Sequence, residues 1–215
     1  MGRLIAIDGL DGSGKGTQSE LLYQYLKEQG VPVRLLSFPT YTAPASTLVE
    51  FYLSGGLGGS PDDTGAYAAS VFFACDRYLS YRTDWKADAD APDTVLIANR
   101  YTTANAVHQL SKLPEEQWEG FLSWLWDFEF CKLGLPAPDK VVYLCVPPQV
   151  SRSLVDSRGR EKDIHELDPH HAERSYAAAR YCAKTLGWQT VECTQTGKMI
   201  DRQAIFAQIR NILEV

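Results

Sequence analysis

The sequence has no long hydrophobic run, no excess of positive charge and no closely spaced pair of cysteines. No stretch approaches the ~18 apolar residues of a membrane span, and the first apolar run leads directly into a glycine-rich loop. We therefore expect neither a membrane anchor nor a signal peptide. The formal net charge of −6 argues against nucleic-acid binding through overall charge. The five cysteines show no CxxC spacing, which is typical of reduced thiols in a cytoplasmic protein.

What remains is the composition of one globular domain. The chain has 215 residues, of which 45% are hydrophobic, enough for a single domain over residues 1–215. Five short apolar runs without apolar–polar alternation predict strands at residues 3–7, 33–38, 94–98, 140–146 and 188–192. Helical patterns separate them, at residues 15–29, 64–85, 115–132, 169–186 and 201–213. This alternation predicts an α/β fold with a central parallel sheet, and the segments 53–63 and 86–93 are predicted surface loops.

The first strand and helix enclose the sequence Gly9-Leu10-Asp11-Gly12-Ser13-Gly14-Lys15, which matches GxxxxGK. Glycines let successive backbone N–H groups point inward around a phosphate, and the helix that follows presents its positive end to the same anion. Lys15 adds a positive charge near the outer phosphates. The motif predicts an ATP-binding loop, made of Gly9, Gly12, Ser13, Gly14, Lys15, Gly16 and Thr17.

One position departs from the usual form of this loop. Gly16 follows the lysine, where a Ser or Thr hydroxyl usually holds Mg²⁺, and Thr17 comes one place later. Magnesium often keeps several waters and binds through the nucleotide's own oxygens. Thr17 and Asp8 are the predicted protein contacts of a Mg²⁺ ion.

Three further segments indicate a second site. FPTY (38–41) and NRYTTANAVHQ (99–109) each follow a predicted strand, and ligands of open α/β sheets bind at the carboxyl ends of strands. VFFACDRY (71–78) lies within a predicted helix and places Phe73 and Arg77 four residues apart on one face. An aromatic ring beside a guanidinium can stack on a base and hydrogen-bond to its edge.

Taken in order, these motifs and the segment GLPAPDKVVYLCV resemble the thymidylate kinase family over essentially the whole chain. The resemblance implies a P-loop NTPase three-layer fold, with a five-stranded parallel sheet, flanking helices and a lid segment. It implies transfer of the γ-phosphoryl group of ATP to dTMP, giving ADP and dTDP for dTTP synthesis, with Mg²⁺ as cofactor. It also implies a cytoplasmic homodimer.

The resemblance also assigns roles to individual residues. Phe73 would stack on thymine and Arg77 would hydrogen-bond to its edge. Asn105 would lie near the ring nitrogen and carbonyl of the base, and Asp11 would meet the 3′-hydroxyl of the sugar. Arg100 would reach the phosphates between donor and acceptor. The implied dTMP-binding residues are Asp11, Phe38, Tyr41, Phe73, Arg77, Arg100, Asn105 and His108.

The predicted lid covers residues 150–168 and is rich in basic side chains. In this family the catalytic arginine comes from the P-loop or from the lid, and this P-loop has none. Phosphoryl transfer is catalysed mainly by positioning and charge stabilisation, which arginines on a closing loop supply. The predicted catalytic residues are Lys15, Arg100, Arg158 and Arg160.

Four positions depart from the family pattern: Thr40, Asn99, Ala104 and His108. His108 replaces an aromatic residue near the sugar 2′ position, which leaves selectivity for deoxyribose open. Two alternatives therefore remain: a kinase for a related pyrimidine nucleotide or a deoxynucleoside, and a non-catalytic nucleotide-binding paralogue. The histidines at 165, 170 and 171 have no cysteine partners, and a metal site is not expected there.

Overall fold

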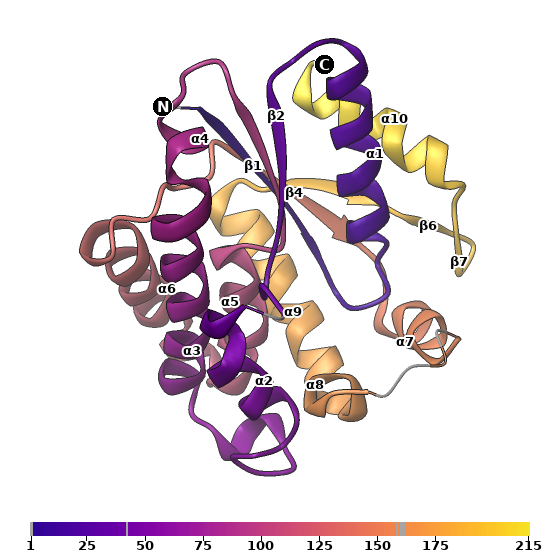
Figure 1. The fold of residues 1–215 in the computed structure, drawn as a ribbon. Helices are drawn as coiled ribbons and strands as arrows, with labels where there is room; N and C mark the ends of the chain where they lie inside the picture. Colours follow the sequence, from indigo (N-terminus) through magenta and orange to yellow (C-terminus); the bar gives the residue numbers. More distant parts are fainter. Residues whose placement is uncertain (1, 42, 158, 160–161) are drawn as a thin grey trace.

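A five-stranded, all-parallel sheet forms the centre of the molecule in the computed structural model, which describes residues 2–41, 43–157, 159 and 162–215. The strand order is β2-β3-β1-β4-β5 (Figure 1). The strands are β1 (Arg3–Gly9), β2 (Val33–Ser37), β3 (Val95–Asn99), β4 (Lys140–Cys145) and β5 (Gln189–Glu192). Thr194–Gln195 (β6) and Lys198–Met199 (β7) form a separate antiparallel hairpin. The five predicted strands and the α/β class are thus confirmed.

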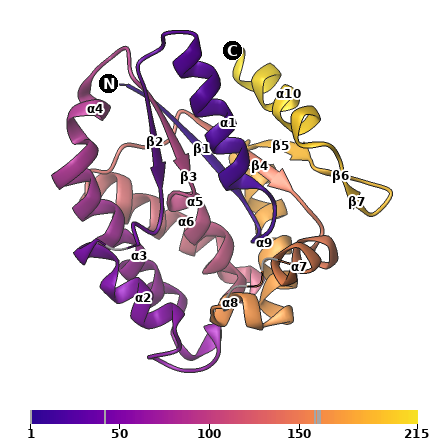
Figure 2. The same ribbon diagram turned by 45° about the vertical axis from the view of Figure 1, so that its right-hand side comes forward.

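Helices cover both faces of the sheet. The α-helices are α1 (Lys15–Glu28), α2 (Thr47–Leu53), α3 (Ala66–Ser80), α4 (Lys86–Asp90), α5 (Thr102–His108), α6 (Trp118–Trp126), α7 (Pro148–Asp156), α8 (Ile164–Leu167), α9 (Pro169–Leu186) and α10 (Arg202–Leu213). Helices α1 and α10 lie on one face, and α3, α5, α6 and α9 lie on the other (Figures 1 and 2). Among the described residues, no helix combines the length and apolarity needed to span a bilayer.

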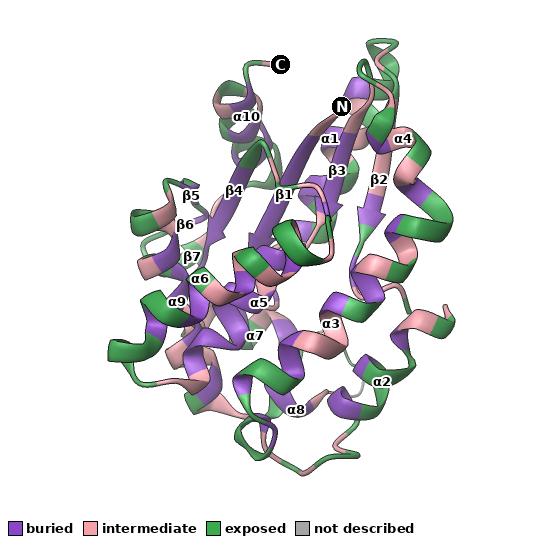
Figure 3. Ribbon diagram, turned by 90° about the vertical axis from the view of Figure 1, so that its left-hand side faces the viewer, coloured by how far each residue is buried: buried purple, intermediate pink, exposed green. Residues whose placement is uncertain are grey.

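Successive strand residues point into two different cores. In β1, Ile5 and Ile7 pack with α1 and α10, whereas Leu4 and Ala6 pack with the helices of the opposite face. Both faces are therefore buried, which explains why the predicted strands lack apolar–polar alternation. Figure 3 shows the buried strands between helices whose outer sides are exposed.

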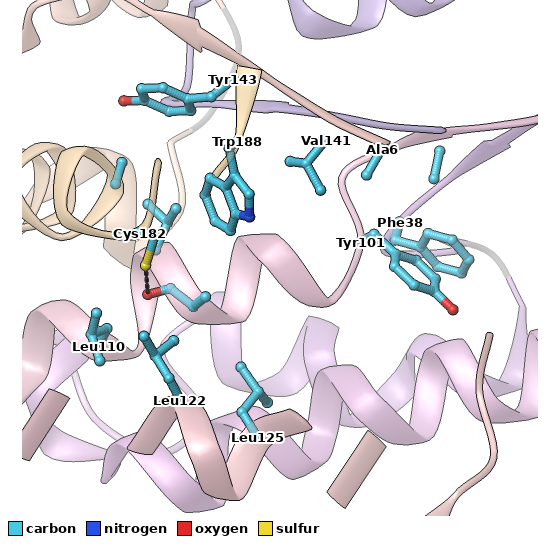
Figure 4. Packing of buried hydrophobic residues seen from close by; sticks show 14 of the residues in the cluster. Ala6, Phe38, Tyr101, Leu110, Leu122, Leu125, Val141, Tyr143, Cys182 and Trp188 are labelled. Atoms are coloured by element: carbon cyan, nitrogen blue, oxygen red, sulfur yellow. Dashed lines mark hydrogen bonds between the residues drawn. The ribbon is translucent and has the colours of Figure 1, made fainter. Parts of the chain in front are cut away.

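The larger core contains aromatic residues from several elements. Trp188 and Leu125 lie in it together with Phe38 and Tyr101, whose ring centroids are 5.9 Å apart (Figure 4). Tyr101 donates a hydrogen bond to the carbonyl of Pro136 (2.9 Å), so its polar end is satisfied. This packing fixes the segments that follow β2 and β3, both of which lead into the second predicted site.

The predicted helices exist, but two of them change their hydrogen-bond pattern near the end. The helix after residue 64 is α-helical over Ala66–Ser80 and π-helical over Tyr81–Trp85. The helix after residue 115 starts as a short 3₁₀ turn, continues as α6 and ends as a π-helix over Asp127–Lys132. A π turn changes which side chains face inward, and such turns are frequent at functional sites.

One predicted loop is wrong. The acidic segment 86–93 contains α4, because Lys86 and Asp90 pair at i,i+4 and Arg34 of β2 pairs with Asp84 and Asp88 from the side. The segment 53–63 is mostly turn, apart from the 3₁₀ turn Pro61–Asp63. The short helices α2, α5, α7 and α8 were not predicted, since none is long enough to show a clear apolar stripe.

Candidate active site

The glycine loop after β1 is shaped by close backbone contacts. Gly12 and Gly14 both have φ of 86°, a left-handed conformation that favours glycine. A Cβ atom on Gly12 would lie 2.6 Å from the carbonyl oxygen of Ser151 in α7. The Ser151 hydroxyl also donates to the carbonyl of Asp11. The loop is therefore held against the first turn of α7, and the helix α1 begins directly behind it.

Lys15, Asp11 and Arg100 form a charge cluster beside this loop. The ammonium of Lys15 donates to the carbonyl of Leu10 (3.2 Å) and lies 3.4 Å from the Asp11 carboxylate, which also pairs with Arg100. Burial, together with the Arg100 charge, lowers the pKa of Lys15 to about 8. Burial alone would raise the pKa of Asp11, but Arg100 and Lys15 hold it well below its usual range. The cluster thus keeps two cations and one carboxylate close together at the loop.

Asp8 and Asn99 lie behind the loop and differ in their hydrogen bonding. Asp8 is fully buried and accepts bonds from the Gly9 amide (2.8 Å) and the Thr103 hydroxyl (2.6 Å), and burial raises its pKa. Asn99 donates to the Ser37 hydroxyl (3.0 Å), while its Oδ1 is buried without a partner among the described residues. The Asn99 amide lies near Gly16, 3.7 Å from where a Cβ on that glycine would be.

The second site centres on a buried ion pair. Arg77 of α3 makes a two-point contact with Glu129 in the π-helical turn, at 2.7 and 2.5 Å. The Thr102 hydroxyl donates to the same carboxylate (2.7 Å), and the Asn105 amide nitrogen donates to the carbonyl of Ser70 (3.1 Å). Side chains from α3, α5 and the end of α6 are thereby locked together.

A cavity of about 490 Å³ lies against this network. Phe73, Arg77 and Asn105 line it, together with Phe38, Tyr41 and His108. Phe73 packs edge-on against Tyr52 at 6.1 Å, which fixes its ring in the cavity wall. A second, more open cavity of about 880 Å³ lies over the glycine loop and shares Asp11, Phe38, Tyr41, Arg100 and Asp163 with the first. The two cavities therefore meet at the charge cluster.

Comparison with known proteins shows the family of the chain. The family model described as "Thymidylate kinase" matches residues 7–203. The chain belongs to the thymidylate kinase family. A thymidylate kinase of Mycobacterium tuberculosis is 31% identical over 191 residues, which cover 86% of this chain and 87% of that protein. One of Arabidopsis thaliana is 30% identical over 151 residues, covering 69% of this chain and 50% of that protein.

Solved structures agree on the fold. The thymidylate kinase of Candida albicans superposes with a TM-score of 0.71 at 20% identity, covering 99% of this chain and 91% of that chain. The predicted P-loop NTPase three-layer fold of the thymidylate kinases is thus confirmed. Within it, the glycine loop and the Arg77 network stand at the carboxyl edge of the sheet, because β1, β2 and β3 all end there.

The four departures from the thymidylate kinase pattern each have a local partner or place. Thr40 donates its amide (2.9 Å) and its hydroxyl to Asp76 of α3. Ala104 lines the smaller cavity. His108 lies with its Nε2 3.2 Å from Arg100 Nη1, so a donated hydrogen bond from the guanidinium reaches the imidazole. Asn99, the fourth, donates to the Ser37 hydroxyl, while its Oδ1 has no partner among the described residues.

The structure brings most of the sequence-predicted residues of the thymidylate kinase site to the two cavities. Arg158 and Arg160 lie outside the described residues. The predicted lid consists of α7, the following segment and α8, and Arg152 lies on α7. Two important residues were missed: Glu129, hidden in an apolar aromatic helix, and Asp163, which caps α8 and lines both cavities. The available signal for Glu129 was its position between Phe128 and Phe130 in an aromatic-rich run.

Proposed function

We propose that this protein is a thymidylate kinase that transfers the γ-phosphoryl group of ATP to dTMP, giving ADP and dTDP. The single observation that carries the acceptor assignment is the buried network of Arg77, Glu129, Thr102 and Asn105 beside a cavity of about 490 Å³. Its polar groups are fixed before any base arrives, so they select a base by its hydrogen-bond pattern.

The orientation of Asn105 supports a thymine-like base. Its Nδ2 donates to Ser70 and, at 3.4 Å, to Glu129, which leaves Oδ1 as the acceptor atom of a residue that lines the cavity. Thymine offers a donor at N3 and an acceptor at O4. Arg77 spends two of its five donors on Glu129 and keeps others for that O4. Cytosine carries the opposite pattern at these two atoms, and Phe73 supplies the stacking surface.

The phosphate groups of donor and acceptor would meet between the two cavities. The loop from Gly9 to Gly14, the amide end of α1 and Lys15 bind the ATP phosphates, with Ser13, Gly16 and Thr17 beside them. Arg100 stands between the cavities and stabilises charge on the transferred group, and Asp11 orients both cations. Tyr41 and Phe38 border the path from one cavity to the other.

The donor set also fits a magnesium ion bound with the nucleotide. Thr17 lines the phosphate cavity and Asn99 holds a buried oxygen without a described partner, so these two would hold Mg²⁺, directly or through water. Bound there, Mg²⁺ would neutralise phosphate charge. Asp8 already accepts two hydrogen bonds and would act behind Thr103 and Gly9.

The remaining expectations belong to the same proposal. Arg158 and Arg160 would complete the catalytic charge when the lid over residues 150–168 closes. The protein would work as a homodimer in the cytoplasm and bind neither nucleic acid nor membrane. The retention of Lys15, Arg77 and Arg100 in one continuous site favours an active enzyme over a non-catalytic paralogue.

The test is coupled ADP release with ATP and Mg²⁺, offering dTMP, dUMP, UMP, dCMP and thymidine in parallel. We expect the highest kcat/KM with dTMP and the lowest with dCMP, because the Asn105 and Arg77 pattern rejects cytosine. A preference for thymidine would reassign the reaction to a nucleoside kinase. ATP binding without turnover on any acceptor would overturn the catalytic proposal.

A further inference from the structure

Three of the four histidines of the chain converge beside the active site. His108 ends α5, His165 lies in α8 and His171 lies in the first turn of α9. All three are buried, and one ring nitrogen from each lies within 4.8 Å of the others. Figure 2 shows α8 at the end of α9 that faces α7. From the sequence, His165, His170 and His171 form one group in which no metal is expected; His170 is exposed on the outer side of α9.

Among the described residues, hydrogen bonds engage one ring nitrogen of His108, one of His165 and, at longer range, both of His171. His108 Nδ1 is buried without a partner among the described residues. His165 uses Nε2 for the Tyr52 hydroxyl (2.7 Å), which leaves Nδ1. Among the described residues, the hydrogen bonds of the His171 ring are long: 3.5 Å to the Ser111 hydroxyl and 3.3 Å to the Ser175 hydroxyl. A metal-binding histidine usually donates its second ring N–H to a carboxylate, a backbone carbonyl or water, and hydroxyl groups can take that place here.

The surroundings keep the imidazoles neutral. Burial lowers the pKa of His171 to about 4 and holds the pKa values of His108 and His165 well below the usual range. A neutral ring offers its lone pair to a metal without competition from a proton. Asp11 faces the cluster as an anion, against the cations of Arg100 and Lys112.

We propose that His108, His165 and His171 form a binding site for one divalent transition-metal ion of the Zn²⁺ class. Three imidazoles suit Zn²⁺, Ni²⁺, Co²⁺ or Cu²⁺ rather than Mg²⁺, which prefers oxygen ligands. Zinc–nitrogen bonds are about 2.0–2.1 Å long, so small side-chain rotations bring the three nitrogens onto one ion. All three histidines line one pocket, from which water can supply the fourth ligand.

This site is coupled to Arg100 through His108. Arg100 Nη1 lies 3.2 Å from His108 Nε2 and can only donate to it. A metal on Nε2 takes the accepting lone pair, and a metal on Nδ1 places the ring proton on Nε2. In both cases Arg100 loses its acceptor, so metal occupancy and the Arg100–His108 hydrogen bond exclude each other. The ion would therefore release Arg100 while it joins α5, α8 and α9.

The test is calorimetric titration of the full, chelator-treated chain with ZnCl₂ and no nucleotide. The background carries Cys75→Ser and Cys131→Ser, which removes the two exposed thiols. We expect one ion per chain and at least a tenfold loss of affinity in His171→Ala. The matched control, His170→Ala, removes the exposed neighbour and should bind like the parent. Equal loss in both variants, or a parent that binds no ion, would overturn the site.

A second measurement needs no variant in the cluster. Only four histidine rings exist, so their ¹⁵N resonances report each one directly. Stoichiometric Zn²⁺ should shift the ring nitrogens of His108, His165 and His171 and leave His170 unchanged. In the Co²⁺ form of the same background, visible bands of a tetrahedral nitrogen site should appear without the near-ultraviolet charge-transfer band of a thiolate. A thiolate band, or shifts restricted to His170, would place the metal elsewhere.

Discussion

The buried network around Arg77 and Glu129 and the glycine loop of residues 9–15 lie within one active site. They differ in how their polar groups are paired. In the network, the Glu129 carboxylate accepts from Arg77, Thr102 and Asn105, so its buried charge is paired. In the loop, the Ser13 hydroxyl is buried without a partner among the described residues, and so is Oδ1 of the neighbouring Asn99 at the end of β3. Burial, together with the Arg100 charge, lowers the pKa of Lys15 to about 8.

The network is rigid because its charges are paired, whereas the loop keeps polar groups available for phosphate. The network contributes to the stability of the fold, because an unpaired Glu129 or Arg77 would be a buried charge. In the loop, burial removes water from charged groups, which costs free energy. The phosphates of a bound nucleotide would offset that cost. Substitutions in the two regions should therefore affect different quantities: stability and base choice in one, turnover in the other.

The largest effect is expected at Lys15. Lys15→Met should lower kcat by ~10³-fold, because it removes one positive charge from the transferred phosphate. The thermal midpoint should stay the same or rise, since the methionine removes a desolvated ammonium. Coupled ADP release and a thermal melt measure the two quantities. A lower thermal midpoint together with an unchanged kcat would contradict the prediction that the loop affects turnover rather than stability.

The next effect is on stability, at Glu129. Glu129→Gln keeps the side-chain volume but leaves the Arg77 charge unpaired, which should cost ~3 kcal/mol of unfolding free energy. For a chain of this size that corresponds to a fall in Tm of roughly 6–12 °C. The control is Glu119→Gln on the exposed side of α6, which should change stability by less than ~0.5 kcal/mol. Equal melts for the two variants would contradict a structural ion pair.

A smaller effect is expected at Asn105. Asn105→Ala should raise KM for dTMP by ~10–100-fold, because a thymine N3–H would be buried without an acceptor. The KM for ATP should not change, since Asn105 faces only the smaller cavity. Steady-state kinetics with each substrate varied in turn separate the two constants. Parallel increases in the KM values for dTMP and ATP would show that the two cavities do not bind their substrates independently.

The smallest effect is a proton taken up at Lys15. In the free protein the pKa of Lys15 lies at about 8, so at pH 8.5 a large share is neutral. Bound phosphates raise that pKa, so ATP binding should take up a proton and its affinity should fall, by less than tenfold per pH unit, above pH 8. Calorimetry at pH 8.5 in two buffers of different ionisation heat measures the uptake. Lys15→Met is the control and should take up none.

Sequence reasoning predicted the parts of the fold that local chemistry encodes. The strands follow from apolar runs buried on both faces, and the glycine loop follows from residues that tolerate left-handed backbone. The placement of Phe73 and Arg77 on one helix face also follows from helical spacing.

The parts it could not predict depend on contacts between distant segments. Glu129 faces Arg77 only because a π turn changes the phase of the helix at residues 127–132, and an α-helical projection does not contain that step. His108 meets His165 and His171 only when α5, α8 and α9 converge. Each of these encounters is a property of tertiary packing rather than of any local pattern.

The Arg77–Glu129 network has a consequence for how acceptor choice could evolve or be redesigned. Its members come from α3, α5 and the turn after α6, and each is held by another member. A single substitution that favours a new base would leave a partner unsatisfied and lower stability. A change of base preference would therefore require coordinated substitutions of Arg77, Asn105 and Glu129. This requirement makes the base preference one of the most evolutionarily constrained properties of this protein.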